Sequence, residues 1–423
     1  MFYRLAKQLA SHKKDVWIVS ATWLAPLLGM IGGLIAARHL APEDLGVVQA
    51  VLLIPSYVGF LQFGVFNGLN RNLPLFRAKG EPDKVQGFVN ASAKMARYVA
   101  IAGALIALAA VLAFFVRSGN SQYTYIALFL IPGLIFGPLV LHKDTLFRGM
   151  QEFERVGKNL HIINLWNLLC AASTSVIGVT GLAIKIGTQS LLGWLLFLRN
   201  PPIKEKGKGS WQDIKMLSAV GMPMLISGVI FTWLAAADRT VIATFLTAED
   251  LGYFALAGIA VNSLKAFPDS INKLLYPRVA HAYGLTGSSR QLRRYIWIGL
   301  GLNLALMIPL VTVGWFALPY LVKTLIPAYS PGIFTAQINL VGALAFCYSG
   351  PSVIIPILRR NLPIQVAGVL AIGLVWGGGI YAIHLGYGIV GVAVARAVAT
   401  GFYGLFVLGF VLYLTHRDFE FES

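Results

Sequence analysis

Charged residues are scarce in this sequence. Asp, Glu, Lys and Arg together make up 12% of its 423 residues, whereas hydrophobic residues make up 57%. A soluble domain carries about 25% charged residues. The composition therefore excludes an ordinary soluble protein and indicates a chain that lies mostly within a lipid bilayer.

Cysteines are few, and phosphate-binding glycine motifs are lacking. Cys170 and Cys347 each lie inside an apolar run, so they are expected to be small buried side chains, with no disulfide framework and no metal site. No Walker-type glycine loop occurs, which removes the usual ATP site. We expect no cofactor. The energy source is then an ion gradient, of protons or sodium, or the gradient of the substrate itself.

Long hydrophobic runs are what the sequence does contain. A membrane-spanning helix needs about 20 mostly apolar residues. Twelve stretches satisfy this length, which predicts an all-α polytopic membrane protein; the division between the fifth and sixth spans is the least defined. The twelve are 16–37, 46–69, 98–116, 122–142, 159–178, 180–198, 218–243, 251–275, 295–318, 332–357, 363–383 and 387–414.

Basic residues outnumber acidic ones and are unevenly placed. The chain has 34 Lys and Arg against 17 Asp and Glu, a net charge of +17. If the N-terminus is cytoplasmic, 27 of the basic residues fall in cytoplasmic segments and four at outer ends or loops. An excess of Lys and Arg marks the cytoplasmic side, so both termini are predicted to lie there. Because the basic residues are spread over seven segments, membrane lipids rather than nucleic acid are the expected partner.

A short motif occurs once in each half of the chain. Leu40–Gly46 reads L-A-P-E-D-L-G, and Leu246–Gly252 reads L-T-A-E-D-L-G, 206 residues further on. Later in each half, Gly178–Ala183 matches Gly388–Ala393 at an offset of 210. Two parallel halves of six spans are typical of transporters that bind their substrate between the halves.

The repeat also predicts the domain organisation. We expect a six-helix bundle at 1–199, a cytoplasmic linker at 200–215 and a second six-helix bundle at 216–423, pseudo-symmetric about a central cavity. The Pro, Lys and Gly content of the linker suits an exposed connection.

The residues around these repeats resemble a known family. An apolar run followed by Arg38–Gly46, then Phe66–Gly68 and Arg71–Pro74, is similar to the polysaccharide-export branch of the multidrug/oligosaccharidyl-lipid/polysaccharide exporter superfamily. Leu146–Gln151 after the fourth span and Asp238–Arg239 in the seventh are similar to the same branch.

The resemblance implies a transporter rather than an enzyme. Proteins of this branch flip an undecaprenyl-diphosphate-linked oligosaccharide from the cytoplasmic to the outer leaflet of the bacterial inner membrane, by alternating access. The expected partners are this lipid-linked oligosaccharide, membrane lipids and a coupling ion, and the protein is expected to act as a monomer. Relatives that flip the peptidoglycan precursor usually carry two further spans, which favours the oligosaccharide branch here.

Charged residues inside the spans are the candidate binding residues, because charge is costly in lipid and is usually functional there. Lys265 and Asp269 are four residues apart in the eighth span and share one helix face, with Asn262 one turn away. We expect all three to line a cavity wall that contacts the diphosphate or the sugars. An internal Lys–Asp pair that only holds helices together is the alternative.

Lys185 and Arg396 form the second candidate. They occupy matching places in the sixth and twelfth spans, each between apolar neighbours. Facing lipid would be costly, so both are expected to point inward, where two cations from the two halves could bind one anion. A position near the outer interface is the other interpretation.

Asp238 and Arg239 lie about two helical turns before Leu246, which is on the predicted outer side. Adjacent residues on a helix do not face each other, so each needs its own partner, and Arg38 is suggested for Asp238. These three residues are predicted to hold the outer side closed, either as a structural lock or as a gate that responds to protonation of Asp238.

Other classes of function stay open. An ion-coupled multidrug exporter of the same superfamily would need mostly acidic cavity residues, whereas the intramembrane charges here are chiefly basic. A multispan glycosyltransferase or polymerase of lipid-linked sugars would need catalytic residues, expected on a sizeable outer loop, and the outer loops are short. A lipid scramblase without sugar specificity is the third alternative.

Overall fold

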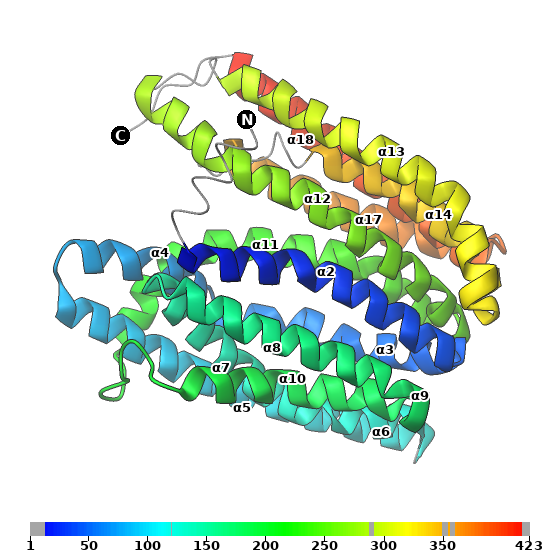
Figure 1. Cartoon of the computed structure of the whole chain (residues 1–423), viewed down its shortest axis with the longest axis horizontal. Helices are drawn as coiled ribbons and strands as arrows, with labels where there is room; N and C mark the ends of the chain where they lie inside the picture. The colour runs from blue at the N-terminus through cyan, green and yellow to red at the C-terminus, as the bar shows by residue number, and fades with distance from the viewer. Residues whose placement is uncertain (1–12, 120, 287–291, 349–353, 356–359, 417–423) are drawn as a thin grey trace. The chain divides into compact units, whose positions relative to one another are not determined.

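The computed structural model describes residues 13–119, 121–286, 292–348, 354–355 and 360–416 (Figure 1). Every element in these ranges is a helix, which confirms the predicted all-α class. Within them, eleven segments are long and apolar enough to cross a membrane, so the chain is a polytopic membrane protein. The remaining predicted span, the eighth (251–275), falls on α12 (Ala248–Thr286), a helix of 39 residues that carries several charged side chains.

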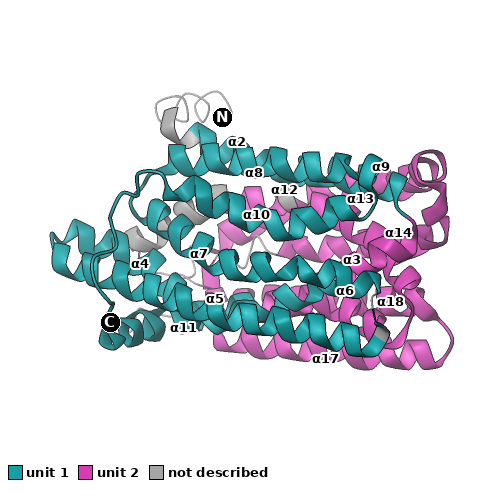
Figure 2. Cartoon of the chain, turned by 90° about the horizontal axis from the view of Figure 1, so that it is seen from below, with its two compact units in different colours: residues 1–40, 51–229 teal, residues 41–50, 230–423 magenta. Residues whose placement is uncertain are grey.

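The chain divides into two compact units (Figure 2): residues 1–40 with 51–229, and residues 41–50 with 230–423. Relative to the predicted domains, residues 41–50 fall in the second unit and residues 216–229 in the first. The boundary drawn from the repeat stays a prediction. We call the two groups unit 1 and unit 2.

In the described residues, unit 1 is built from eleven helices and parts of helices. α2 packs along α8, α5 along α7, and α10 against both α7 and α8 (Figure 1). Its elements are α2 (Lys13–His39), the end of α3 (Pro42–Val58), η1 (Gly59–Gln62), α4 (Val65–Ala78), α5 (Pro82–Ser118), α6 (Gln122–Leu128), α7 (Leu130–Gly149), α8 (Phe153–Ala172), α9 (Thr174–Ile177), α10 (Thr180–Leu198) and the start of α11 (Trp211–Phe245).

Unit 2 contains the start of α3, the end of α11 and the helices that follow. α18 packs against α17 and α14, and α12 packs against α13 and α14. Besides α12, its elements are α13 (Arg293–Leu325), η3 (Pro327–Gly332), α14 (Ile333–Gly342), η4 (Ala343–Tyr348), α17 (Leu362–His384) and α18 (Gly388–His416).

The second predicted span was drawn too long. The helical run that begins at Pro42 stops at Gln62, because Phe63 and Gly64 both adopt left-handed backbone conformations, with φ of 46° and 76°. Gly64 is required there, since a Cβ would lie 2.5 Å from the backbone nitrogen of Met222. Ser218 also contacts this break, because its Oγ donates to the Phe63 carbonyl at 2.6 Å. Residues 65–78 are therefore a separate helix, α4.

The fifth and sixth spans are separated as predicted, at a glycine. Gly178 has φ of 58° and stands between α9 and α10. Residues with side chains rarely adopt this conformation. The fifth span therefore runs through α8 and α9, and the sixth is α10.

The sequence predicted an exposed connection between α10 and α11. In the structure this connection is hydrogen-bonded to α5 of unit 1. Asn90 of α5 pairs with the backbone of Lys206, accepting from its N–H at 2.8 Å and donating to its carbonyl. Gln86 donates to the Lys204 carbonyl at 3.0 Å. Gly209 (φ 67°) comes so close that a Cβ would lie 2.6 Å from the Asn90 carbonyl oxygen. We call residues 199–210 the linker strap.

Glu205 is the one acidic residue of the linker strap. Its carboxylate pairs with Lys143 and, at 3.0 Å, with Arg97, and His142 Nε2 lies 3.3 Å away. His142, and after it Lys143, hold the pKa of the Glu205 carboxyl below its ordinary value. A carboxyl with a lowered pKa stabilises the fold above its ordinary pKa, and this contribution is lost as the pH falls toward the folded-state value.

The repeated motif packs against itself within unit 2. A Cβ on Gly46 would overlap the carbonyl of Ala248, and a Cβ on Gly252 would overlap the carbonyl of Pro42. Each glycine thus lies against the first turn of the helix that carries the other copy. Close backbone approach through small residues is the usual way for membrane helices to associate. The motif therefore encodes one symmetric helix crossing.

Replacing either crossing glycine should destabilise the protein. We expect Gly46→Ala and Gly252→Ala to cost about 1–3 kcal/mol or more, because the backbone carbonyl opposite cannot move away as a flexible side chain could. The measurement is the yield and thermal stability of the detergent-purified protein. Gly258→Ala is the matched control on the same helix α12, since nothing lies within 4 Å of a Cβ there. Equal stability of Gly252→Ala and Gly258→Ala would contradict the crossing.

Candidate substrate-binding site

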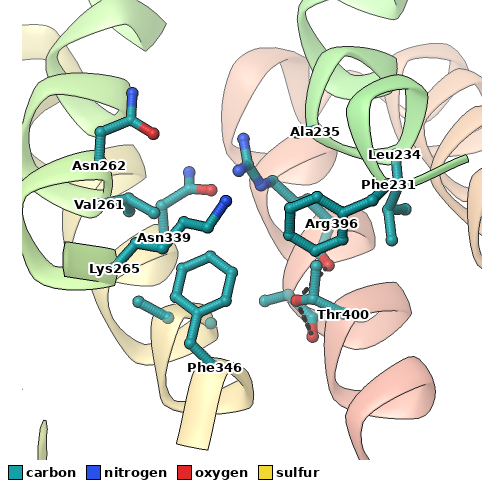
Figure 3. Close-up of a pocket in the computed structure, with 13 residues that line it drawn as sticks. Phe231, Leu234, Ala235, Val261, Asn262, Lys265, Asn339, Phe346, Arg396 and Thr400 are labelled. Atoms are coloured by element: carbon teal, nitrogen blue, oxygen red, sulfur yellow. Dashed lines mark hydrogen bonds between the residues drawn. The ribbon is translucent and has the colours of Figure 1, made fainter. Parts of the chain in front are cut away.

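A pocket lies inside unit 2, between the middle parts of four helical segments. It is lined from α11, α12, α14 with η4, and α18 (Figure 3). The side chains that matter below are Phe231, Asn262, Lys265, Asn339, Phe346 and Arg396. The accessible cavity volume is about 50 Å³, enough for a few water molecules. A larger ligand would therefore require these helices to separate.

Lys265 enters the pocket from α12. Its Nζ lies 4.3 Å from the ring centroid of Phe231 and 5.9 Å from that of Phe346 (Figure 3). An ammonium over an aromatic face is attracted by the ring, an interaction worth about 0.5–2 kcal/mol. Among the described residues, no carboxylate lies within ion-pair distance of Lys265. The aromatic rings are thus direct contacts of the ammonium, and the Asp269 carboxylate acts on it only from beyond ion-pair distance.

The other two predicted binding residues of α12, Asn262 and Asp269, differ in their position relative to the pocket. Asn262 lines the same pocket as Lys265, as the spacing predicted. Asp269 is exposed and is not one of the residues that line the described pocket. The internal Lys–Asp pair that was the alternative is not formed between these two side chains in the described structure.

Arg396 enters from α18 and is paired. Its Nη1 makes an ion pair with Oδ2 of Asp238 on α11, a carboxylate that is completely buried. The other oxygen, Oδ1, accepts from the Arg239 backbone N–H at 2.7 Å. In the described structure the ion-pair partner of Asp238 is therefore Arg396. Arg38, the partner suggested from the sequence, belongs to unit 1, and its pairing with Asp238 stays a prediction. Helical spacing identifies the face of a residue but not which helix packs against that face.

Arg239 points elsewhere, as expected for a neighbour of Asp238 on a helix. Its guanidinium donates to the carbonyl of Ala235 at 3.1 Å and lies 3.5 Å from Oε1 of Gln49 on α3. Arg38 is exposed at the end of α2. The proposed joint role of Arg38, Asp238 and Arg239 in closing the outer side stays a prediction.

Lys185 lies on α10 in unit 1, where it is half-buried. Arg396 belongs to unit 2. The hypothesis that the two cations bind one anion stays a prediction.

Sequence reasoning missed three pocket residues. Asn339 lies in the wall from α14, where its amide donates to the Thr335 carbonyl at 3.0 Å (Figure 3). An amide inside the apolar run 332–357 was a usable signal, because polar groups in spans are usually placed toward other helices or a cavity. Phe231 and Phe346 gave no such signal, since aromatic residues occur throughout the spans.

Metal binding finds no support in the part of the chain that the structure describes. No group of three or more His, Cys, Asp or Glu side chains is gathered there. Cys170 and Cys347 are buried, as predicted.

The sequence match defines the family. Residues 35–328 match the model of a family described as polysaccharide biosynthesis protein, and the chain belongs to this family. No curated protein sequence matches the chain significantly.

Solved structures define the fold. An inward-facing multidrug resistance MATE family transporter of the MOP superfamily matches with a TM-score of 0.70 and 13% identity, over 96% of this chain and 99% of that one. The lipid II flippase MurJ, in an inward closed conformation, matches with 0.70 and 14%, over 94% and 87%. A MOP superfamily transporter from Pyrococcus furiosus matches with 0.62 and 12%, over 96% of each chain. The fold is therefore MATE-like, and the chain combines this fold with membership of a polysaccharide biosynthesis family.

The ion pair between Asp238 and Arg396 generates a stability prediction. Asp238→Asn or Arg396→Gln alone should cost about 3–5 kcal/mol, because each leaves an uncompensated buried charge or polar group. The double variant should cost less than the sum, since it removes both charges. Thermal unfolding of the purified variants measures this. Arg239→Gln is the neighbouring control and should cost less. Additive losses in the double variant would contradict a direct pair.

Proposed function

We propose that the protein flips an undecaprenyl-diphosphate-linked oligosaccharide from the cytoplasmic to the outer leaflet by alternating access. The observation that carries this proposal is Lys265, a cation without a carboxylate partner in a pocket between predicted spans. A diphosphate is the anionic part of such a lipid. Its charge would be stabilised by an ammonium that makes no ion pair among the described residues.

The charge of the pocket supports an anionic cargo. Lys265 and Arg396 are the charged residues among those that line it in the described structure, and both are cationic. Arg396 already has a carboxylate partner, so Lys265 contributes the excess charge. A multidrug exporter for cations would be expected to carry the opposite sign. The related transporter from Pyrococcus furiosus is described as having a binding pocket of reverse polarity that suggests a different function.

Amide side chains of the pocket suit the sugar part of the cargo. Asn262 and Asn339 line the wall beside Lys265. Amides donate and accept hydrogen bonds, as sugar hydroxyls do. An aromatic wall from Phe231 and Phe346 would exclude water around the ammonium and so strengthen its attraction for an anion.

The location follows from the same proposal. We place the protein in the bacterial inner membrane with both termini cytoplasmic, acting as a monomer and driven by a proton or sodium gradient or by its substrate gradient. The distribution of Lys and Arg supports this orientation.

Lys265→Gln should lower transport without lowering the amount of folded protein. No ion pair is broken by the change, whereas the loss of a charge-assisted bond to the substrate should slow flipping about ten-fold or more. Lys265→Arg should restore part of the rate, because the charge is kept but its geometry differs. The assay is flipping of purified lipid-linked oligosaccharide in liposomes.

A matched control is available in unit 1. Lys84 is an exposed lysine that pairs with Glu81 at 2.7 Å, and Lys84→Gln should transport normally. Wild-type transport by Lys265→Gln, or export of a cationic drug that improves in it, would count against the oligosaccharide and for the multidrug exporter.

The orientation is tested by reporter fusions. A reporter inserted in the 199–210 segment, or fused after 416, should report the cytoplasm, because both lie on the Lys- and Arg-rich side. A reporter after Gly119 should report the outside. An outer signal from the 199–210 segment would reverse the proposed direction of flipping.

A further inference from the structure

A second cationic cluster lies in unit 1, where the function proposed above makes no use of it. Arg97 of α5 and His142 and Lys143 of α7 converge on one carboxylate, that of Glu205 in the linker strap. Lys143 and His142 reach Oε1, and Arg97 reaches Oε2. Both carboxylate oxygens are therefore bound by basic side chains from two helices.

The part of the cluster that α7 carries is built into the fold, whereas Arg97 of α5 is exposed. His142 is 2% exposed and Lys143 9% exposed. The imidazole is oriented by a hydrogen bond of 2.9 Å between its Nδ1 and Ser92 Oγ on α5. Burying basic groups is costly, and a fold retains them where an anion compensates.

One buried polar atom of the cluster, Nε2 of His142, lacks a well-formed hydrogen bond. His142 Nε2 lies 3.3 Å from Glu205 Oε1, within ion-pair distance, but does not form a hydrogen bond of good geometry with it. A buried nitrogen without a partner is costly, and most such atoms in proteins are satisfied. This nitrogen is directed at the position that the carboxylate occupies, so an anion with more acceptor oxygens would bind it better.

The charges of the cluster also favour an anion with more negative charge than one carboxylate. Two permanent cations, Arg97 and Lys143, and an imidazole face one carboxylate. A second anionic oxygen group would balance the remaining positive charge. Phosphate oxygens offer this, and arginine and lysine are their usual ligands.

Glu205 also lies on a non-helical segment, the linker strap, which could move away from the cationic cluster. It is carried by the linker strap, which is held to α5 through Asn90 and Gln86 and contains no helix of its own between α10 and α11. A carboxylate on such a segment can be exchanged for a ligand without unfolding a helix.

We propose that Arg97, His142 and Lys143 form a binding site for a diphosphate, which Glu205 occupies in this structure as an internal substitute. Binding of the diphosphate displaces Glu205 and releases the linker strap. Naming the diphosphate as that of the lipid substrate rests on the proposed function, since the proposed topology puts this cluster on the cytoplasmic side from which the lipid would arrive. The anion site itself does not depend on it.

The first experiment measures binding of inorganic pyrophosphate to the full-length protein in nanodiscs, by its effect on thermal unfolding at constant ionic strength. Glu205→Gln removes the competing charge, so its apparent Kd for pyrophosphate should be at least about ten-fold lower than that of the wild type. Glu81→Gln is the matched control, since it removes a half-buried carboxylate of unit 1 outside the cluster, and it should bind as the wild type does.

Two further variants locate the site. Lys143→Gln, combined with Glu205→Gln, should abolish the stabilisation by pyrophosphate, whereas Lys265→Gln combined with Glu205→Gln should retain it. If pyrophosphate no longer stabilised the Lys265→Gln single variant, the anion would be placed in unit 2 and the proposal would be overturned. Absence of any tighter binding in Glu205→Gln would show that the carboxylate is only a structural tie.

A measurement on the wild type does not depend on the folding of any variant. The linker strap contains Lys204, Lys206 and Lys208, whose side chains are exposed. Saturating pyrophosphate should accelerate tryptic cleavage there several-fold, because the strap leaves Asn90 and Gln86. Chloride at the same ionic strength should not. An unchanged cleavage rate under saturating pyrophosphate would overturn the displacement.

The source of the diphosphate is decided by competition. Nanodiscs that contain undecaprenyl diphosphate should displace pyrophosphate from Glu205→Gln, whereas nanodiscs with undecaprenyl monophosphate should do so more weakly. Displacement by uridine diphosphate in solution but not by the lipid would overturn the lipid assignment and leave a nucleotide-type anion site. Neither result depends on the flipping assay of Lys265→Gln, so failure of one proposal is distinguishable from failure of the other.

Discussion

A charge inside a bilayer has to be matched, and this requirement organises unit 2. Asp238 is completely buried, and it is tolerated because Arg396 and the Arg239 backbone satisfy both of its oxygens. The Arg239 side chain turns instead to Ala235 and Gln49. Lys265 is the exception, because the groups around its ammonium are aromatic rings. Matched charges hold the helices together, and the unmatched one is free to bind something else.

Much of the fold could be predicted because the bilayer imposes it. Long apolar runs must be helices in lipid, so the all-α class followed from composition, as did eleven of the twelve predicted spans. The breaks inside those runs did not follow. Phe63 and Gly64 continue an apolar run, and only the close approach of Met222 explains why the helix stops there. The repeated motif was visible, but its physical content, a crossing of two glycines against backbone carbonyls, depends on the packing of helices far apart in sequence.

The candidate site was predicted in part, for a related reason. Helical spacing correctly put Asn262 and Lys265 in one wall, since residues three or four apart share a face. It also grouped Asp269 with them, and that residue proved to be exposed. Periodicity says which residues lie together on a helix, but not how far along the helix the pocket extends. Nor does it say which helix lies opposite, which is why the pairing of Asp238 with Arg396 was not predicted.

The same matching rule connects the two cationic groups of the molecule. In unit 2 the ammonium of Lys265 is stabilised by neutral rings, so an anion arriving there would displace only water and weak contacts. In unit 1 the cations Arg97 and Lys143 already have a carboxylate, so an arriving anion must compete with Glu205. The first arrangement favours binding outright. The second links binding to movement of a chain segment, because the competitor is attached to the linker strap. A protein that must first accept a charged lipid and then change conformation would need both kinds of site. An ion pair between two helices supplies neither, because its charges are already matched and both lie on helices.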